Sequence, residues 1–177
     1  KVFEDITSLR ESLVHFSEMG TILTENTEAT LNDLFDRYVG RSFATPEYKE
    51  AQMVRSLRFT LNNQICIPYK EKEIKAGYAT TKLPLVSETG GRLRAIKPIA
   101  FQQKKTIAML DHGEIWIGRV NRLIKEKAIT PDRMLFAVEP PTFSNKNFKK
   151  AFQEITGEMV NMGVSVIPFE EKQEIVK

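Results

Sequence analysis

The sequence is short of cysteine, of long apolar runs and of the common catalytic signatures. Its one cysteine, Cys66, cannot form an internal disulfide, so we expect a buried, unreactive thiol in a reducing compartment, the cytoplasm. No apolar run approaches the roughly 18 residues of a membrane-spanning helix, so we expect a soluble chain without a membrane partner. GxGxxG, Walker, HExxH, CxxC and GxSxG patterns are all missing. These absences argue against the commonest nucleotide-binding, zinc-hydrolase, redox and serine-hydrolase functions.

What is present is an ordinary globular balance, with 41% apolar and 28% charged residues in a chain of 177. The charge is uneven along the chain. Residues 1–42 carry 4 basic and 8 acidic groups, whereas residues 43–127 carry 16 basic and 8 acidic groups. We therefore expect an acidic helical segment over 1–42 and a mixed α/β domain over 43–177. The chain begins at Lys1 without an initiator methionine, so we expect a fragment whose native N-terminus is missing.

Helical spacing dominates the first third of the chain. Apolar residues at helical intervals predict a helix over 4–19 and a second from Thr27 to about Gly40. A third helix is expected to begin at Thr45-Pro46, because proline is well tolerated at the first helical position. Its apolar stripe is formed by three residues, namely Val54, Leu57 and Leu61.

The period then changes to that of strands. Residues 65–67 predict a short strand, and the charged run 70–73 predicts a turn. Residues 77–86 are β-prone, although Pro84 indicates a sheet edge or the end of a strand. Residues 87–91 predict a turn, followed by a strand over 92–101.

Residues 106–110 fit either a strand or the start of a long helix, and we favour the strand. Asp111 and Glu114 have the spacing of a capping box, and Gly113 would weaken a helix interior. We therefore expect a helix from about His112 to Lys127. A chemical alternative remains, because two carboxylates and an imidazole at a strand–helix junction suit a divalent metal or a proton relay. We favour capping.

The C-terminal part predicts two further strands around one helix. Residues 134–138 are continuously apolar, which is typical of a central strand. Ser144 is expected to cap the next helix, which Gly163 would close, and 164–168 predict the last strand. We expect the charged tail after it to fray.

Basic residues gather in the middle of the chain, in segments that adjoin in sequence. Such a set suits phosphate, so we expect a DNA- or RNA-binding surface that holds the backbone without sequence specificity. Its expected members are Arg92, Arg94, Lys97, Lys104, Lys105, Arg119, Arg122 and Lys125. Tyr78, Phe101 and Trp116 are the candidate stacking residues. A second small basic group, Lys146, Lys149 and Lys150, is better explained as a solvated helix face.

Over residues 46–139 the expected order is helix, strand, strand, strand, helix, strand. This αβββαβ order resembles the core of the restriction-endonuclease-like, PD-(D/E)xK nuclease superfamily, and the segment Val164–Lys172 resembles uncharacterised prophage-type bacterial proteins. The resemblance implies a mixed sheet with helices on its faces. It also implies an acidic-x-lysine triplet, but here Ala95 stands two residues before Lys97 where the carboxylate is required.

We therefore expect a non-catalytic, nucleic-acid-associated domain with a degenerate nuclease-like core and no cofactor. One alternative is a protein-interaction or regulatory module, in a phage-related or bacterial assembly or as a homodimer. The other is a metal-dependent nuclease with a non-standard site, which would use Mg²⁺. Its residues would be Lys97, Asp111, Glu114 and Glu139, with Glu88 as a further carboxylate near the sheet.

Overall fold

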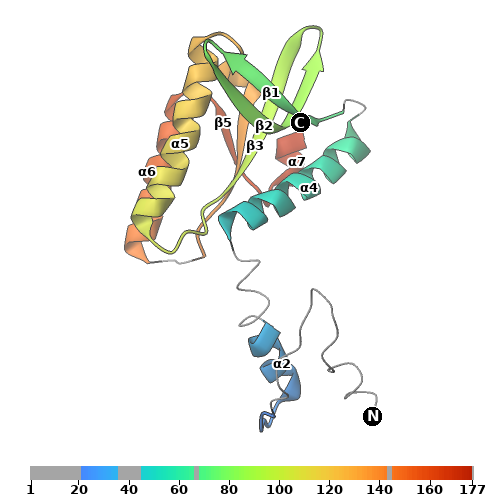
Figure 1. Cartoon of the computed structure of the whole chain (residues 1–177), viewed down its shortest axis with the longest axis vertical. Helices are drawn as coiled ribbons and strands as arrows, with labels where there is room; N and C mark the ends of the chain where they lie inside the picture. Colours follow the sequence, from blue (N-terminus) through green and yellow to red (C-terminus); the bar gives the residue numbers. More distant parts are fainter. Residues whose placement is uncertain (1–20, 36–44, 66–67, 143–144, 177) are drawn as a thin grey trace, which may run out of the picture. The chain divides into compact units, whose positions relative to one another are not determined.

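A computed structural model describes residues 21–35, 45–65, 68–142 and 145–176 of the chain. The chain divides into two compact units, Lys1–Val39 and Gly40–Lys177. In the first unit helix α2 spans Thr27–Phe35 and begins at the residue that the sequence predicted (Figure 1). The helix expected over 4–19 and the helix end expected near Gly40 lie outside the described residues.

The second unit is an α+β fold built on a five-stranded mixed sheet in the order β1-β2-β3-β4-β5. The strands are β1 (Lys70–Ala76), β2 (Ala79–Thr89), β3 (Arg92–Ala100), β4 (Met134–Glu139) and β5 (Ser165–Pro168). The β1–β2 and β2–β3 pairs are antiparallel, whereas β3–β4 and β4–β5 are parallel. The helices are α4 (Pro46–Gln64), α5 (Thr106–Lys125), α6 (Lys146–Asn161) and α7 (Lys172–Val176), with a 3-10 turn over Pro131–Arg133.

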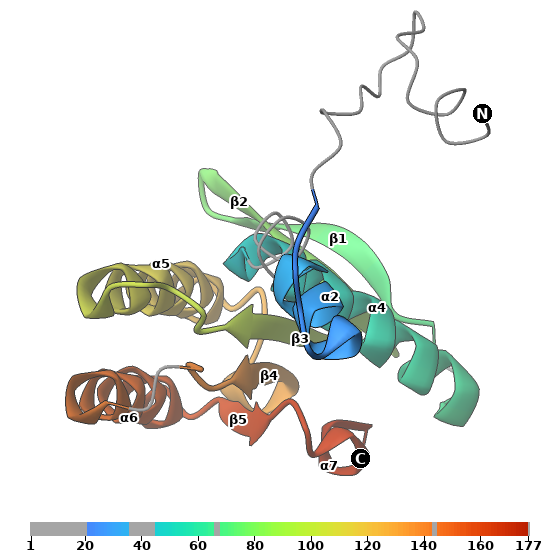
Figure 2. The ribbon, with the colours of Figure 1, turned by 90° about the horizontal axis from the view of Figure 1, so that it is seen from below.

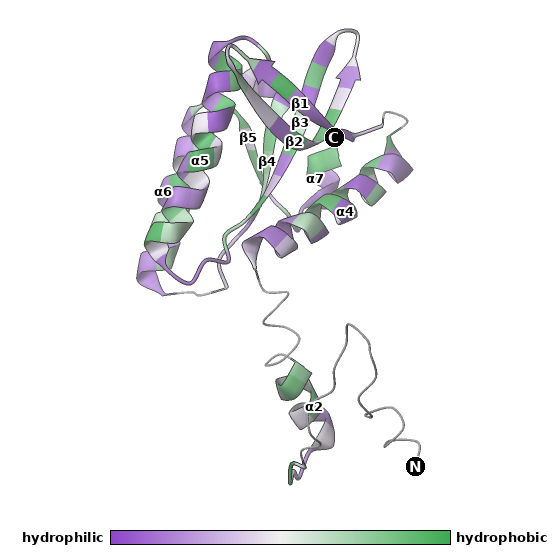
Figure 3. Cartoon of the chain, viewed as in Figure 1, coloured by the Kyte–Doolittle hydropathy of each residue, from purple (hydrophilic) through white to green (hydrophobic). Residues whose placement is uncertain are grey.

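The helices cover both faces of this sheet (Figure 2). Helices α5 and α6 pack on one face, and their core includes Ala95, Ile99 and Phe136. Helices α4 and α7 pack on the other face, with Ile96 and Leu135. Hydrophobic and hydrophilic residues alternate along α5 and α6 in Figure 3, as expected of helices that bury one side. No helix in the described residues has the length and apolar character needed to cross a membrane.

Helix α4 starts as predicted. The Thr45 side chain accepts a hydrogen bond from the backbone N–H of Tyr48, and Pro46 occupies the first helical position. Leu57 and Leu61 are buried, which confirms the predicted stripe. Ile65 caps the end of α4 and belongs to no strand, so the prediction that a strand begins at residue 65 is wrong. Cys66 and Ile67 lie outside the described residues.

The β1–β2 and β2–β3 hairpins correct two predictions about turns. Residues 70–73 are not a turn but the exposed start of β1. The predicted 87–91 turn is reduced to Gly90 and Gly91, whose φ angles of 58° and 71° suit a tight two-residue hairpin. Pro84 lies inside β2 and not at its end, but it has no partner in the register with β1 or in the register with β3, which begins at Leu85. It is tolerated because the β1–β2 register is irregular there, with Lys70 opposite Val86 and Lys72 opposite Leu83.

The strand predicted over residues 106–110 is wrong, because helix α5 already begins at Thr106. They are the first turns of the helix, so Asp111 and Glu114 lie within it, exposed, and cap nothing. Gly113 misled the prediction because its role depends on the fold. A Cβ built on Gly113 would stand 2.1 Å from Cγ1 of Ile155 in α6. The glycine therefore lets the two helices approach closely, and this tertiary contact outweighs its poor helix propensity.

The C-terminal half largely follows the sequence. Strand β4 is buried as predicted, and β5 follows α6. The cap of α6 is Asn145 instead of Ser144; its side chain accepts from the N–H groups of Asn147 and Phe148. The tail does not end loosely in the described residues, because α7 buries Ile175 and Val176 against the core of α4.

Candidate functional site

A buried carboxylate near the start of α4 connects three elements of the fold. Oε2 of Glu50 accepts a hydrogen bond from Nζ of Lys97 at 2.5 Å, and its Oε1 lies 2.7 Å from Nε2 of His112. The N–H of Ala100 also donates to Oε1 at 3.3 Å. The side chains of Glu50 and Lys97 are only 13% and 6% exposed. Because Lys97 lies on β3 and His112 on α5, the cluster joins helices that cover opposite faces of the sheet.

All three donors of the Lys97 ammonium group have a nearby partner. Besides Glu50, Nζ donates to the carbonyl oxygen of Pro98 at 2.8 Å. It also lies 4.2 Å from the centroid of the Trp116 ring, within range of a cation–π interaction. An ammonium group has three N–H donors and no acceptor. Lys97 is therefore held by the protein itself, although the sequence placed it on a phosphate-binding surface.

The pKa values of the pair follow from burial and mutual attraction. Burial alone would raise the pKa of Glu50, but the hydrogen bond from His112 and the charge of Lys97 outweigh it and hold the pKa below its usual value. Burial lowers the pKa of Lys97, and the charge of Glu50 opposes this without cancelling it. Arg119 adds a small repulsion that lowers the Lys97 pKa further. Both shifts mark a tightly packed ion pair.

Sequence reasoning missed Glu50, although its spacing carried a signal. Glu50 lies four residues before Val54 and seven before Leu57, which places its carboxylate on the buried stripe of the helix. A charge on that stripe needs a partner of opposite charge. Lys97 gave the complementary signal, because it stands between Ala95 and Ile99 on the buried side of a strand.

A second group of side chains lies on the C-terminal half of α5 and on the β1–β2 turn. The guanidinium carbon of Arg119 is 4.8 Å from the Trp116 ring centroid, and that of Arg122 is 5.9 Å from the Tyr78 ring centroid. Lys125 is also exposed. None of these three cations forms an ion pair with a described acidic residue. Tyr78, Trp116, Arg119, Arg122 and Lys125 are called the α5 surface below.

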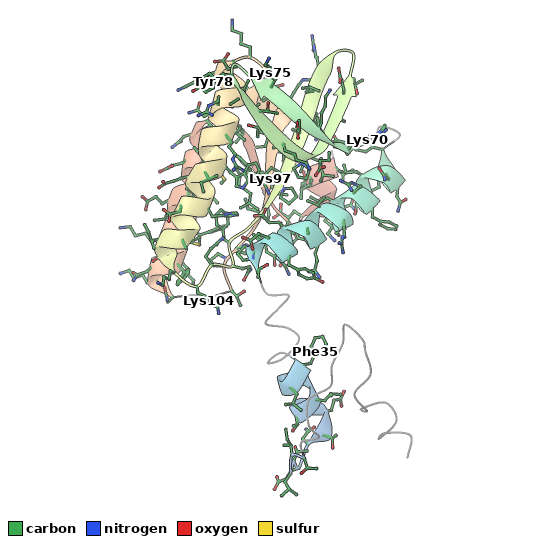
Figure 4. All side chains as sticks on the ribbon, viewed as in Figure 1. Phe35, Lys70, Lys75, Tyr78, Lys97 and Lys104 are labelled. Atoms are coloured by element: carbon green, nitrogen blue, oxygen red, sulfur yellow. The ribbon has the colours of Figure 1, made fainter. Side chains whose placement is uncertain are left out.

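The other predicted basic residues are spread over different parts of the unit. Lys104 and Lys105 precede α5, at the opposite end of a helix about 30 Å long (Figure 4). Arg94 alternates with Leu93 and Ala95, which join the α5–α6 core, so it lies on the α4 side of the sheet. Arg92 is exposed near the end of α5. The expected single surface is thus divided, and its α5 members form the most compact part.

Beside the C-terminal end of α5 lies an open pocket of about 570 Å³. Its walls include Arg92, Lys127 and Arg133. Lys127 follows α5 with a left-handed backbone, φ 55°. Two cations in the walls have acidic partners: Lys72 pairs with Glu88 at 2.6 Å, and Arg133 lies 3.9 Å from Asp132. Arg92 and Lys127 are the two wall cations without an ion pair among the described residues, and they extend the positive charge of α5 beyond the helix.

The candidate carboxylates do not meet in one place. Glu88 pairs with Lys72, and Oε1 of Glu139 pairs with Lys49 at 3.0 Å. Asp111 and Glu114 are exposed on α5. Oε2 of Glu139 is buried without a hydrogen-bond partner. Over the described ranges, no group of three or more His, Cys, Asp or Glu side chains is arranged to hold a metal ion.

Comparison with known proteins adds one match. A family described as "Protein of unknown function (DUF3037)" matches residues 1–39, which end before α4 begins. No curated protein and no solved structure matches the chain. The match concerns the first unit alone, so it assigns no function to the side chains of the second unit.

Proposed function

We propose that the Gly40–Lys177 unit is a non-catalytic, nucleic-acid-associated domain that binds the phosphate backbone through the α5 surface. One observation carries the proposal. Arg119, Arg122 and Lys125 are exposed without an acidic partner in the described residues, and the two arginines lie over aromatic rings. Unneutralised cations attract phosphate, and aromatic faces beside them accept bases or sugars.

The order of elements supports the same proposal. From α4 to β4 the chain runs helix, three strands, helix, strand, apart from the short 3-10 turn before β4. This order is similar to that of the restriction-endonuclease-like core, whose members act on nucleic acid. Element order alone does not imply function, so the proposal depends on the side chains.

The proposed absence of catalysis follows from the state of Lys97. In the nuclease superfamily the corresponding lysine is expected to polarise the attacking water beside metal-binding carboxylates. Here its donors are directed at Glu50, at Pro98 and at the ring of Trp116. Ala95 occupies the place of the motif's acidic residue. The cluster therefore has the character of a structural ion pair.

Binding is tested by fluorescence anisotropy with labelled oligonucleotides over a salt series. We expect affinity to fall steeply with salt, because each neutralised phosphate releases counterions. A triple variant, Arg119→Gln, Arg122→Gln and Lys125→Gln, should reduce the slope of log K against log salt by roughly 3 on duplex DNA, about 0.9 per contact. Absence of binding at low salt would refute the proposal.

The chain offers a matched control for net charge. Lys146, Lys149 and Lys150 are also exposed, at the start of α6. Changing all three to glutamine removes the same charge from a different helix. We expect this control to change the slope of log K against log salt by less than about 0.9, the contribution of one phosphate contact. Equal losses in the two triple variants would show that overall charge, and not the α5 surface, governs binding.

The nuclease alternative is tested separately. Supercoiled plasmid is incubated with the protein and Mg²⁺ or Mn²⁺, and the proposal predicts no cleavage above a mock preparation. Cleavage that is lost in Glu139→Ala or Lys97→Met, with folding intact, would replace the proposal with a metal-dependent nuclease.

A protein-interaction role is the second candidate, and a groove favours it. A largely apolar groove of about 540 Å³ runs along α6 beside β5, and Val138, Phe152 and Val166 line it. Val160 on its wall is 56% exposed. Solution mass measurement of the chain and of Val160→Asp tests self-association. A dimer that the substitution dissociates would support this second candidate.

A further inference from the structure

This inference rests on the proposed function and names the ligand class of the same surface. We infer that the α5 surface binds single-stranded nucleic acid, with an unpaired base stacked on Tyr78. Figure 4 shows Tyr78 at the end of the β1–β2 hairpin beside α5, away from Lys104 at the other end of the helix.

Tyr78 is held out into solvent by the geometry of its turn. The hairpin closes between Ala76 and Ala79, which are paired, and Gly77 has a φ of 61°. A positive φ suits glycine, so this turn is readily formed here. Tyr78 is 95% exposed, and the exposed ring contributes nothing to the core. Arg122 lies 5.9 Å from the ring centroid, and the Glu126 carboxylate lies against the same turn, about 3.4 Å from where a Cβ on Gly77 would stand.

An aromatic ring in this position favours single strands over duplex. In a duplex the base faces are covered by their neighbours, so a protruding ring finds only phosphate and sugar. An unpaired base offers a free π-face, and such stacking tolerates any sequence. A nearby guanidinium then contacts the phosphate while its plane lies against the ring.

The spacing of the cations fits a short run of nucleotides. Trp116 and Arg122 are six residues apart, about 9 Å along the helix axis. Arg119, Arg122 and Lys125 follow at intervals of three residues, about 4.5 Å along the axis and about 60° around it at each step, so the row winds around the helix. Trp116 is half-buried between elements, with Lys97 and Arg119 within 5 Å of its ring centroid. We therefore place the strand along α5, from Trp116 towards Tyr78.

The experiment compares single strands with duplex at one salt concentration. Fluorescein-labelled oligomers of deoxythymidine and of uridine, about 12 nucleotides long, are titrated beside a mixed-sequence duplex of equal length. We expect tighter binding of single strands. Tyr78→Ala should weaken single-strand binding roughly 5- to 150-fold, which corresponds to the stacking free energy of one base. Duplex binding should change less than twofold.

Two internal controls accompany this test. Phe59 on α4 is another exposed aromatic, at 71%, and Phe59→Ala should leave binding unchanged. Tyr78→Phe keeps the ring and should retain most of the affinity. Trp116 is the single tryptophan, so its fluorescence should change when a single strand binds, in the unlabelled protein.

The outcomes separate this inference from the proposed function. Equal binding of single strands and duplex, with Tyr78→Ala unchanged on both, would overturn the inference and leave phosphate binding standing. No binding to any oligomer at low salt would overturn both. A loss in Phe59→Ala equal to that in Tyr78→Ala would also overturn the inference, because exposed aromatic area in general would then explain binding. Since Tyr78 lies outside the core, we expect the Tyr78 variants to fold as the wild-type protein does, so each measurement can be made.

Discussion

Replacing Glu50 by glutamine should destabilise the Gly40–Lys177 unit by about 3 kcal/mol. Removing one partner of a buried ion pair costs about 3–5 kcal/mol, because the other charge stays desolvated without compensation. Lys97 is 6% exposed, so water cannot replace the lost carboxylate. Glutamine keeps one oxygen that accepts a hydrogen bond, which places the cost at the lower end of that range.

The measurement is urea unfolding followed by Trp116 fluorescence, since this single tryptophan lies 4.2 Å from Lys97 and reports on the unit that contains the pair. A loss of about 3 kcal/mol corresponds to a fall in Tm of roughly 6–12 °C for a chain of this size. Glu88→Gln is the matched control. It breaks an ion pair of similar length whose side chains are about half exposed, so it should cost less than about 1 kcal/mol.

A double-mutant cycle completes the test. Glu50→Gln combined with Lys97→Met removes both charges, so the double variant should be more stable than the sum of the two single losses predicts. Two results would refute this reasoning: a cost of Glu50→Gln no greater than that of Glu88→Gln, or additive losses from Glu50→Gln and Lys97→Met. In either case the Glu50–Lys97 ion pair would not stabilise the unit.

Three further outcomes follow from named contacts. Because the pKa of Glu50 is lowered in the folded state, the unfolded state binds more protons in acid. The stability from this group is therefore present above about pH 4.5 and is lost progressively as pH falls through the lowered pKa. Urea titrations at several pH values should show this fall in the free energy of unfolding, and Glu50→Gln should remove it. Gly113→Ala should destabilise the unit by about 1–3 kcal/mol, because the new Cβ meets Ile155. Gly118→Ala should stabilise it by up to about 1 kcal/mol, because a Cβ there has nothing within 4 Å. Equal effects of the two substitutions in thermal unfolding would contradict the close packing of α5 on α6. Asn145→Ala should cost about 0.5–2 kcal/mol through loss of the α6 cap, and protection of the Phe148 amide from hydrogen exchange should fall with it.

Much of the fold could be predicted because local patterns carried it. The start of α4 followed from Thr45 and Pro46, and buried β4 followed from its continuous apolar run. Errors occurred where a distant contact overrode the local pattern. Gly113 was interpreted as a helix breaker because Ile155, its packing partner, lies in another helix. Pro84 predicts a sheet edge or the end of a strand, but it lies inside β2, and the irregular register of β1 opposite it cannot be recognised from β2 alone.

The candidate site shows the same division. The sequence by itself determined the concentration of basic residues in the middle of the chain and the loss of the acidic motif residue at Ala95. Only the tertiary structure decided which cations are available. It buries Lys97 against Glu50, places Lys104 and Lys105 at the far end of α5, and leaves Arg119 and Arg122 exposed beside aromatic rings. Charge is a property of composition, but its availability depends on desolvation and on partners that folding brings from distant parts of the chain.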